Sequence, residues 1–476
     1  MASSVEPDIG RRIDRVFAAQ RARALALRSS TAEERIAKLR KLVSTVESHR
    51  EDIREAAAAD FRKPRSEVDL TELLPILTEA RHAIRHVAEW MQPRRVSPTL
   101  AMLGTSAEIR YEPRGVTLII VPWNYPFNLA FCPLVSAMAA GNTAIIKPSE
   151  MTPHCSALTR RLVEEAFDEA DVAVFEGDAD VATALLDHPF DHVFFTGSPQ
   201  VGRLVMAAAA KHLTSITLEL GGKSPCIVDA SADLKKTARA ISAGKFANSG
   251  QTCIAPDYLL VHAAIKDRLV AEIIASIEHA YGAGAESQHA TPDYCRMVNE
   301  KHYARVRGLF DEAVSRGAKV VYGGGFSPED RFISPTLLAD VAPDSRVLDE
   351  EIFGPLLPTV TFTEIGEAIA LVNSKPKPLA LYVFGRDRQV IDRVLTQTSA
   401  GDTCVNHTVI HFLHQNLPFG GVNNSGIGKS HGLYGFEAFS HARSVLRDHW
   451  SVVHWMFPPY TPRVRRLIAL TLKWLT

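Results

Sequence analysis

Apolar runs that alternate with helical segments constrain the fold of this chain more than any other feature. Gly115–Val121 and Asn142–Ile146 consist mostly of aliphatic and β-branched residues, which is typical of strands that a parallel sheet buries on both faces. Between them, Phe127–Ala140 is a small-residue segment of helical length. Strands separated by helices in this manner predict a doubly wound α/β sheet.

The alternation continues through most of the chain and restarts once. Residues 8–91 before it are predicted to be helical, with Thr31-Ala-Glu-Glu as a helix start. After the restart at Pro225, a second α/β unit is expected to reach about Phe384. A length of 476 residues also exceeds what one core usually supports, so two or three domains are expected. Further strands are predicted at Val172–Phe175, His192–Phe195, Ser215–Leu220, Tyr258–Val261, Leu357–Phe362 and Leu379–Phe384.

The composition argues against several classes of function. The 53 basic and 54 acidic residues give a formal net charge of −1, so no broad basic surface for nucleic acid is expected. No segment reaches the ~18–20 apolar residues that a membrane span requires, and the N-terminus lacks the apolar core of a secretion signal. The six cysteines form no CxxC pair and no zinc-site spacing. We therefore expect no metal site, no disulfide framework and no transmembrane span, and a reducing, cytoplasmic location.

Cys253 lies in the segment Gly244–Pro256, among glycines and short polar residues and just ahead of a predicted strand. A cysteine reacts as its thiolate, and small neighbours let backbone N–H groups surround the sulfur and, later, an oxyanion. The alternative is that the thiol only fills space in the core, as free cysteines commonly do. On its own the segment favours that alternative, so its chemistry depends on the rest of the chain.

Five further segments place polar residues or glycines at the ends of predicted strands, where open α/β sheets collect their ligands. Phe195–Gly202 joins a strand, a glycine turn and a helix start that could receive a phosphate, although it lacks GxGxxG. Glu219 ends an otherwise apolar strand, where an acid without a function is unusual. The segments are Pro122–Pro126, Lys147–Glu150, Phe195–Gly202, Glu219–Ser224 and Glu351–Pro355, joined later by Pro418–Gly421.

In this order, and together with Phe246–Cys253, the segments resemble the NAD(P)-dependent aldehyde dehydrogenase superfamily from about Ile36 to Val445. The ending Ser425–Gly432 followed by Phe436–His441 is most similar to the class 3 branch, which includes fatty, aromatic and coniferyl aldehyde dehydrogenases. The resemblance implies the aldehyde dehydrogenase fold, with a Rossmann-like cofactor domain, a catalytic α/β domain and an oligomerisation arm. The implied bounds are 1–97 with 113–218 for the cofactor domain, 219–418 for the catalytic domain, 98–112 and 436–460 for the arm, and 461–476 for a C-terminal helix.

The resemblance also implies a mechanism and a set of site residues. Cys253 would attack the aldehyde, and the Asn124 amide with the Cys253 N–H would hold the oxyanion. Glu219 would then act as the general base for thioester hydrolysis. The implied cofactor is NAD, with NADP as a second option, held by Trp123, Lys147, Glu150, Gly197, Ser198, Gly202, Glu351 and Phe353. The implied substrate contacts are Tyr125, Asn406 and Phe419.

The substrate is expected to be a hydrophobic aldehyde, either aromatic such as coniferyl aldehyde or of medium to long chain, and the assembly a homodimer. Two departures from the family pattern, Asn423 and Asn406-His407, are expected near the substrate loop and bear on substrate choice. Three alternatives stay open. They are a CoA-acylating aldehyde dehydrogenase, a cysteine hydrolase or acyltransferase built on Cys253 and a histidine, and a non-catalytic protein of the same fold.

Overall fold

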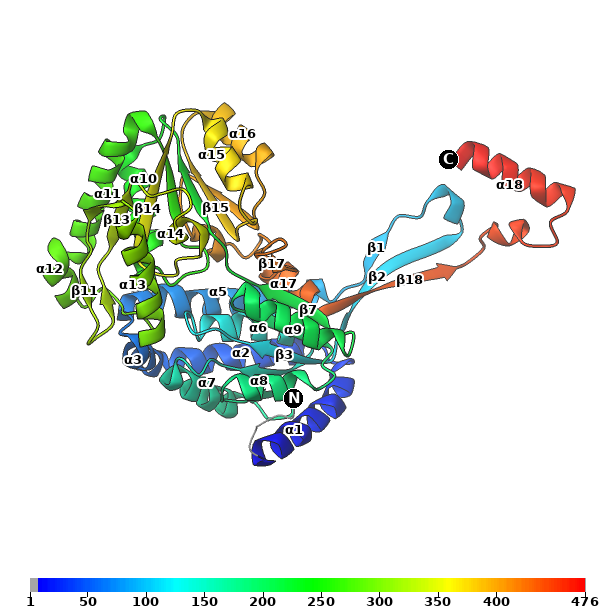
Figure 1. The fold of residues 1–476 in the computed structure, drawn as a ribbon. Coiled ribbons are helices and arrows are strands. Elements are labelled where there is room, and N and C mark those ends of the chain that lie inside the picture. The colour runs from blue at the N-terminus through cyan, green and yellow to red at the C-terminus, as the bar shows by residue number, and fades with distance from the viewer. Residues whose placement is uncertain (1–6, 476) are drawn as a thin grey trace.

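The computed structural model describes residues 7–475 as two α/β domains from which a long arm projects (Figure 1). The first domain contains a six-stranded sheet in the order β17-β7-β6-β3-β4-β5, in which only β17 is antiparallel to its neighbour. Its strands are β3 (Val116–Ile120), β4 (Thr143–Lys147), β5 (Val172–Val174), β6 (His192–Thr196), β7 (Ser215–Glu219) and β17 (Gly426–Ile427). The predicted doubly wound sheet is confirmed.

The helices of this domain follow from capping and apolar spacing. Thr31 caps helix α2 through a capping box with Glu34, as the sequence predicts. Helix α6 is buried almost all round, so its small residues let it pack between the sheet and the N-terminal helices. The helices are α1 (Pro7–Leu27), α2 (Ala32–Ser48), α3 (Arg50–Phe61), α4 (Arg65–Val68), the π-helical turn η1 (Asp69–Leu73), α5 (Leu74–Trp90), α6 (Asn128–Ala140), α7 (Pro153–Ala166), α8 (Ala179–Leu186), α9 (Pro199–Ala210) and α17 (Gly432–Ala438).

The strand order creates a topological switch point between β3 and β6. From β3 the chain proceeds to β4 and β5 on one side, and then returns to place β6 and β7 on the other side. The connections therefore leave the carboxyl ends of β3 and β6 in opposite directions, which opens a crevice there. Pro122–Pro126 follows β3 and Gly197–Ser198 follows β6, so two of the segments singled out in the sequence border this crevice.

The second domain contains a seven-stranded sheet in the order β10-β13-β14-β9-β8-β15-β16, parallel except for β10. Helix α10 and the short helical turn η3 lead from β8 to β9 and carry the chain to Cys253. The strands are β8 (Pro225–Val228), β9 (Tyr258–His262), β10 (Lys319–Tyr322), β13 (Thr336–Ala339), β14 (Leu356–Phe362), β15 (Ala380–Phe384) and β16 (Asp402–Val405), with a separate hairpin of β11 (Phe326–Ser327) and β12 (Phe332–Ile333). The helices are α10 (Leu234–Phe246), η3 (Ala247–Gly250), η4 (Ala263–Ile265), α11 (Lys266–Tyr281), α12 (Gly284–Ala290), α13 (Glu300–Ser315), α14 (Arg346–Asp349), α15 (Ile365–Asn373), α16 (Arg388–Gln397) and η5 (Ile410–Leu413).

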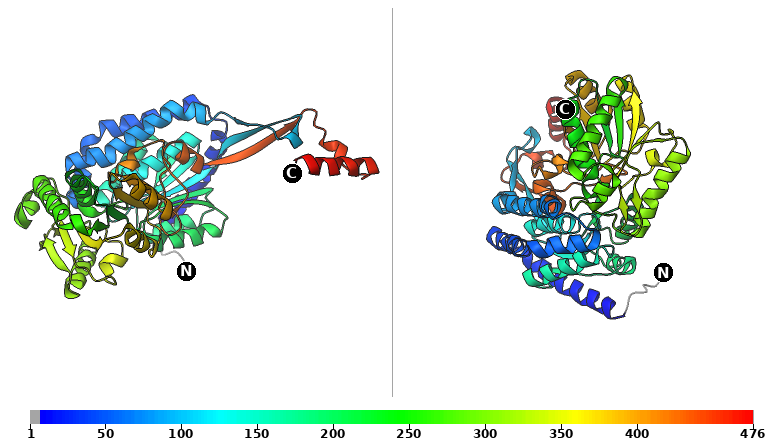
Figure 2. Two further views of the ribbon diagram at one scale, coloured as in Figure 1. Left: turned by 90° about the horizontal axis from the view of Figure 1, so that it is seen from above. Right: turned by 90° about the vertical axis from the view of Figure 1, so that its left-hand side faces the viewer.

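The arm is a three-stranded antiparallel sheet, β1-β2-β18, that extends well beyond both domains (Figures 1 and 2). Its strands are β1 (Arg94–Val96), β2 (Thr105–Pro113) and β18 (Ser440–Asp448), followed by η6 (Val453–Met456) and helix α18 (Pro462–Leu475), with η2 (Leu100–Met102) at the β1–β2 turn. The sheet thus begins at Arg94, earlier than the expected bound of 98, and 436–439 belongs to α17 and the turn that follows it. None of the helices within residues 7–475 is both long and apolar enough to span a bilayer.

Candidate active site

Cys253 is presented by a tight turn between the two domains. Asn248 and Ser249 both adopt left-handed backbone conformations with φ of 53°, and Gly250 follows with φ of 73°. A Cβ on Gly250 would lie 2.3 Å from the Gly354 carbonyl oxygen, so the turn requires glycine at this position. Cys253 itself is partly exposed, unlike the other five cysteines, which are buried free thiols.

Three cavities meet at Cys253. One of about 230 Å³ lies on the switch-point side and is lined by Trp123, Ser198, Glu351 and Phe353. A second of about 260 Å³ is lined mostly by apolar side chains, including Leu70, Leu74 and Phe412. A third, an inner chamber of about 40 Å³, lies behind the thiol among Glu219, Phe419 and Ser430. Cys253 therefore borders both the apolar cavity and the switch-point cavity, and it shares the inner chamber with the carboxyl of Glu219.

Burial, together with the nearby carboxyls of Glu351 and Glu219, raises the pKa of the Cys253 thiol to about 12. The backbone N–H groups of Cys253 and Ile254 act in the opposite direction, because they hydrogen-bond the thiolate form. The thiol is therefore protonated at neutral pH in this arrangement. It can become a nucleophile only if a base takes its proton or the surrounding negative charge is reduced.

Glu219 ends β7 and is 5% exposed. Oε1 accepts a hydrogen bond from Ser430 Oγ at 3.2 Å, whereas Oε2 has no partner among the described residues. Burial raises the pKa of Glu219 well above its ordinary value, and the hydrogen bond from Ser430 opposes the shift. A buried carboxyl with one free oxygen facing the cavities is able to exchange a proton with a water or a thiol.

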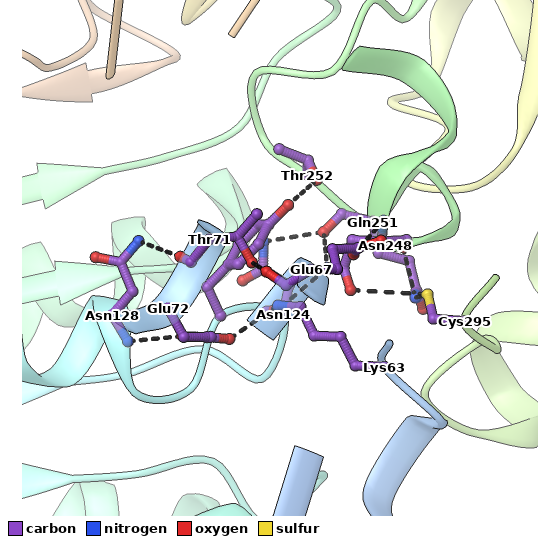
Figure 3. A network of polar contacts seen from close by, with 11 residues as sticks. Lys63, Glu67, Thr71, Glu72, Asn124, Asn128, Asn248, Gln251, Thr252 and Cys295 are labelled. Carbon is purple, nitrogen blue, oxygen red and sulfur yellow. Dashed lines mark hydrogen bonds and ion pairs between the residues drawn. The ribbon is translucent and has the colours of Figure 1, made fainter. Parts of the chain in front are cut away.

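The Asn124–Tyr125 segment after β3 lies against the turn that precedes Cys253 (Figure 3). The Asn124 amide donates to the Gln251 carbonyl at 3.1 Å, and the Tyr125 hydroxyl lies 2.6 Å from Thr252 Oγ1. An amide NH₂ carries two donors, so the second proton of Asn124 can serve an oxyanion on a carbon attached to Cys253. Tyr125, which the family resemblance implies as a substrate contact, lines the apolar cavity.

The switch-point cavity has the features that a dinucleotide requires. Ser198 caps helix α9 by accepting from the Val201 N–H at 3.3 Å, so the positive end of a twelve-residue helix faces the crevice. A Cβ on Gly221 would lie 2.2 Å from the Glu351 carboxyl, so glycine leaves room for that side chain in the cavity wall. At the end of β4, outside the lining of this cavity, Lys147 Nζ is 2.9 Å from Glu150 Oε2, and the Glu150 side chain is 45% exposed.

Four of the residues singled out in the sequence lie outside the two larger cavities. Asn406 lines none of the three cavities, and its amide donates to the Gly385 carbonyl and accepts from the Gly385 N–H. Asn423 is likewise outside them, in a left-handed turn that asparagine tolerates. Gly202 packs helix α9 against Leu220 instead of facing the cavity, since a Cβ there would lie 2.7 Å from that side chain. Phe419 lies in the inner chamber, stacked on His431, and not in the apolar cavity.

The sequence did not indicate several residues that the fold brings to the site. Ser430 reaches Glu219 from 211 positions away, and no local motif around it signals that contact. His302 and Arg305 line the switch-point cavity from α13, and Trp123 packs between His302 and Phe353. The apolar cavity is closed by the π-helical turn η1 and by residues 409–413, segments that read as ordinary helix and loop.

Comparison with known proteins identifies the family. The family model described as "Aldehyde dehydrogenase family" matches residues 8–445. The chain is 42% identical to 4,4'-diaponeurosporen-aldehyde dehydrogenase of Staphylococcus aureus, over 90% of this chain and 93% of that protein. It is 43% identical to the dimeric NADP-preferring aldehyde dehydrogenase of Rattus norvegicus, over 87% of this chain and 89% of that protein.

A solved structure agrees with the sequence comparisons. The substrate-bound state of Staphylococcus aureus AldH is 40% identical and superposes with a TM-score of 0.91, over 96% of this chain and 99% of that one. These matches confirm the family and fold that the segments around Cys253 indicated. The chain therefore belongs to the aldehyde dehydrogenase family.

Proposed function

We propose that this enzyme oxidises a hydrophobic aldehyde to the carboxylic acid, with Cys253 as nucleophile, Glu219 as general base and NAD as the preferred cofactor. The class of reaction follows from the family, whose members oxidise aldehydes with NAD(P). The observation that carries the proposal is the position of Cys253, which lies where the apolar cavity, the switch-point cavity and the chamber around Glu219 meet.

The protein groups perform three tasks. Cys253, after losing its proton, attacks the aldehyde carbon from the apolar cavity, and the Asn124 amide with the Cys253 N–H receives the negative oxygen. Trp123, Ser198, Glu351 and Phe353 would hold the nicotinamide half of the cofactor, which would supply the hydride acceptor for the carbon attached to Cys253, so that Cys253 would carry a thioester. Glu219 then takes a proton from the water that hydrolyses the thioester, and its raised pKa suits it to hold that proton near neutral pH.

The walls of the apolar cavity support a hydrophobic substrate. Leu70 and Leu74 line it with 61% and 38% of their surfaces exposed, and Ile410 and Leu413, also in its lining, are 49% and 38% exposed. Exposed aliphatic side chains that converge on a catalytic group gain free energy when an apolar ligand covers them. Aromatic aldehydes and aldehydes of medium to long chain both have this property, and acetaldehyde does not.

The proposed NAD preference depends on Glu150. A carboxylate can accept from the ribose hydroxyls, but it would repel a 2′-phosphate. The NADP-preferring name of the rat relative shows that the family includes the other choice. For this chain we propose NAD as the better cofactor, with NADP also accepted. Trp123, Ser198, Glu351 and Phe353 would hold the nicotinamide and pyrophosphate half, and Lys147 with Glu150 the adenosine ribose.

We further propose a cytoplasmic homodimer, because two surfaces lack a partner in the single chain. Strand β18 is one edge of the arm sheet, and Leu446 on it is 57% exposed. Helix α9 exposes Val201, Leu204 and Met206. A small sheet of this kind with an open edge is marginal alone and gains stability by adding strands. The rat relative is named as dimeric. Six free thiols suit a reducing compartment.

The test of the proposed activity is the absorbance of NADH at 340 nm on mixing protein, cofactor and an aldehyde. A series of short aliphatic, long aliphatic and cinnamyl-type aldehydes, each with NAD and with NADP, ranks substrates and cofactors together. Cys253→Ala should abolish turnover while leaving the fold and cofactor binding intact, and Cys226→Ala, a buried thiol in β8, is the matched control. Substantial activity in Cys253→Ala would exclude Cys253 as the nucleophile.

A further inference from the structure

Lys63 is a fully buried cation close to the catalytic turn. Its Nζ lies 2.9 Å from Glu72 Oε1, and both side chains have no solvent exposure. The same ammonium lies 4.0 Å from the centroid of the Tyr125 ring, on the segment that carries Asn124. Two buried charges lose several kcal/mol of hydration, so a pair of this kind is retained where its geometry serves another purpose.

Glu72 connects this pair to the Asn124 loop, which is the segment between β3 and α6. Its Oε2 accepts from the Asn128 N–H at 2.8 Å, in the first turn of α6 and four residues after Asn124. The Asn128 side-chain amide in turn donates to the Thr71 carbonyl at 3.1 Å. The entry into α6 is therefore tied at two points to the segment 71–72 (Figure 3).

Glu67, four residues before Thr71, contacts the Cys253 turn, which is the left-handed turn that precedes Cys253. Its Oε1 accepts from the Asn248 N–H at 2.6 Å, in the left-handed turn that presents Cys253. The Asn248 amide then donates to the carbonyls of Asn124 and Gln251, at 3.0 and 3.1 Å. The two loops thus contact each other and are both held by carboxylates from one short stretch of chain (Figure 3).

The π-helical turn η1 lies between two acids five residues apart, Glu67 and Glu72, whose carboxylates bind the two loops. In an α-helix, side chains five positions apart diverge by about 140°, because each residue turns the helix by about 100°. The wider turn Asp69–Leu73 takes up one extra residue and so reduces that divergence. Burial raises the pKa of Glu67 to about 7, and the charge of Lys63 and the Asn248 N–H oppose this rise.

We infer that Lys63 is a positioning residue, which holds the Asn124 loop and the Cys253 turn in register through its ion pair with Glu72, its contact with the Tyr125 ring and the attraction of its charge for the neighbouring Glu67. Lys63 touches neither the thiol nor either catalytic opening; it acts through the two carboxylates and the Tyr125 ring. Its loss would let each loop move independently, and misplacement of reacting groups by about 1 Å can reduce a rate by about a hundredfold.

The variant Lys63→Met keeps the length of the side chain and removes its charge. Arg35→Met is the matched control, because Arg35 is also a buried cation, but it lies on α2 and donates to the Ala139 carbonyl at the far end of α6. In a rapid-mixing experiment, Lys63→Met should form NADH with the full amplitude of about one per site and a rate constant lowered by about tenfold to a hundredfold. Arg35→Met should lose thermal stability and keep the wild-type rate constant.

A readout independent of activity separates this inference from the proposed function on which it rests. Hydrogen exchange followed by mass spectrometry should show faster exchange at the Asn128 and Asn248 amides in Lys63→Met and unchanged exchange there in Arg35→Met. Wild-type protection of both amides in Lys63→Met would overturn the inference, whatever the dehydrogenase activity. A lower burst amplitude at an unchanged rate constant would also overturn it, because it would indicate only a loss of folded sites.

A second variant covers the case in which Lys63→Met does not fold. Glu67 is less buried than Lys63, so Glu67→Ala should fold, and it removes the acceptor of the Asn248 N–H while leaving the Lys63–Glu72 pair in place. It should slow the burst about tenfold and increase exchange at the Asn248 amide, without altering exchange at Asn128. A wild-type burst rate in Glu67→Ala would show that the link to the Cys253 turn has no catalytic role.

Discussion

Ser430 donates a hydrogen bond of 3.2 Å to Oε1 of Glu219, while Oε2 of the same carboxyl has no partner among the described residues. The two residues are 211 positions apart in the sequence but come from adjacent strands, Glu219 from the end of β7 and Ser430 from the segment after β17, which pairs with β7. One oxygen is fixed by the protein and the other is available to a water, so the carboxyl is oriented while one oxygen stays free to exchange a proton.

Glu219→Gln should separate the two halves of the reaction. Glutamine keeps the size and much of the hydrogen bonding of glutamate but cannot take a proton from water. Rapid mixing should show an initial burst of at most about one NADH per site, followed by turnover slowed by ~10²–10⁴. Intact-protein mass spectrometry should then detect an acyl group on Cys253. Turnover at the wild-type rate, or no acyl-enzyme at any pH, would remove Glu219 from thioester hydrolysis.

Ser430→Ala should shift the pH profile of steady-state turnover to higher pH. The Ser430 hydrogen bond favours the ionised form of Glu219 and so lowers its pKa against the effect of burial. Without it the pKa of Glu219 rises, and the base reaches its active, deprotonated form only at higher pH. Ser136→Ala, in the same chamber but without a bond to Glu219, is the control. A profile that stays in place or moves to lower pH would contradict this role.

Glu150→Gln should narrow the difference between the two cofactors. The wild-type enzyme is expected to show a higher kcat/KM with NAD than with NADP, because the carboxylate repels a 2′-phosphate. Glutamine removes the repulsion and weakens the bond to the ribose by the ~1.5–3 kcal/mol of a charged hydrogen bond, so the ratio should move toward NADP by about tenfold or more. Glu164→Gln on helix α7 is the control. A wild-type preference for NADP would show this assignment of Glu150 to be wrong.

The assembly prediction is tested by light scattering after gel filtration. At micromolar concentration, the molar mass of the wild-type protein should be twice the 52.2 kDa of one chain. Leu446→Asp should weaken the dimer, because it places a charge on the open edge strand of the arm. Leu395→Asp, on an exposed position of α16 in the other domain, should leave the mass unchanged. A wild-type monomer would exclude the proposed assembly.

Much of the fold could be predicted from local sequence alone. The apolar runs Gly115–Val121 and Asn142–Ile146 became β3 and β4, each buried at all five positions, because a continuous β-branched run has no exposed face to offer. Thr31 began α2 through interactions with a residue three positions away. Residues 69–73 were less predictable, because the same helical spacing is compatible with an α-helix and with the π turn that the packing selects.

The same distinction between local sequence and tertiary packing applies to the residues of the site. By itself, the sequence determined the chemical groups, since Cys253, Glu219 and Asn124 lie in short segments whose residue types suit their chemistry. Only the tertiary structure decided which oxygen of Glu219 is free, why Asn406 is turned to Gly385, and that Lys63 lies under Tyr125. These relationships join residues between 21 and 211 positions apart, and they arise from the packing of whole elements. A local sequence pattern can specify a side chain and its own turn, but the partner of a buried polar group is fixed only when the sheets and helices meet.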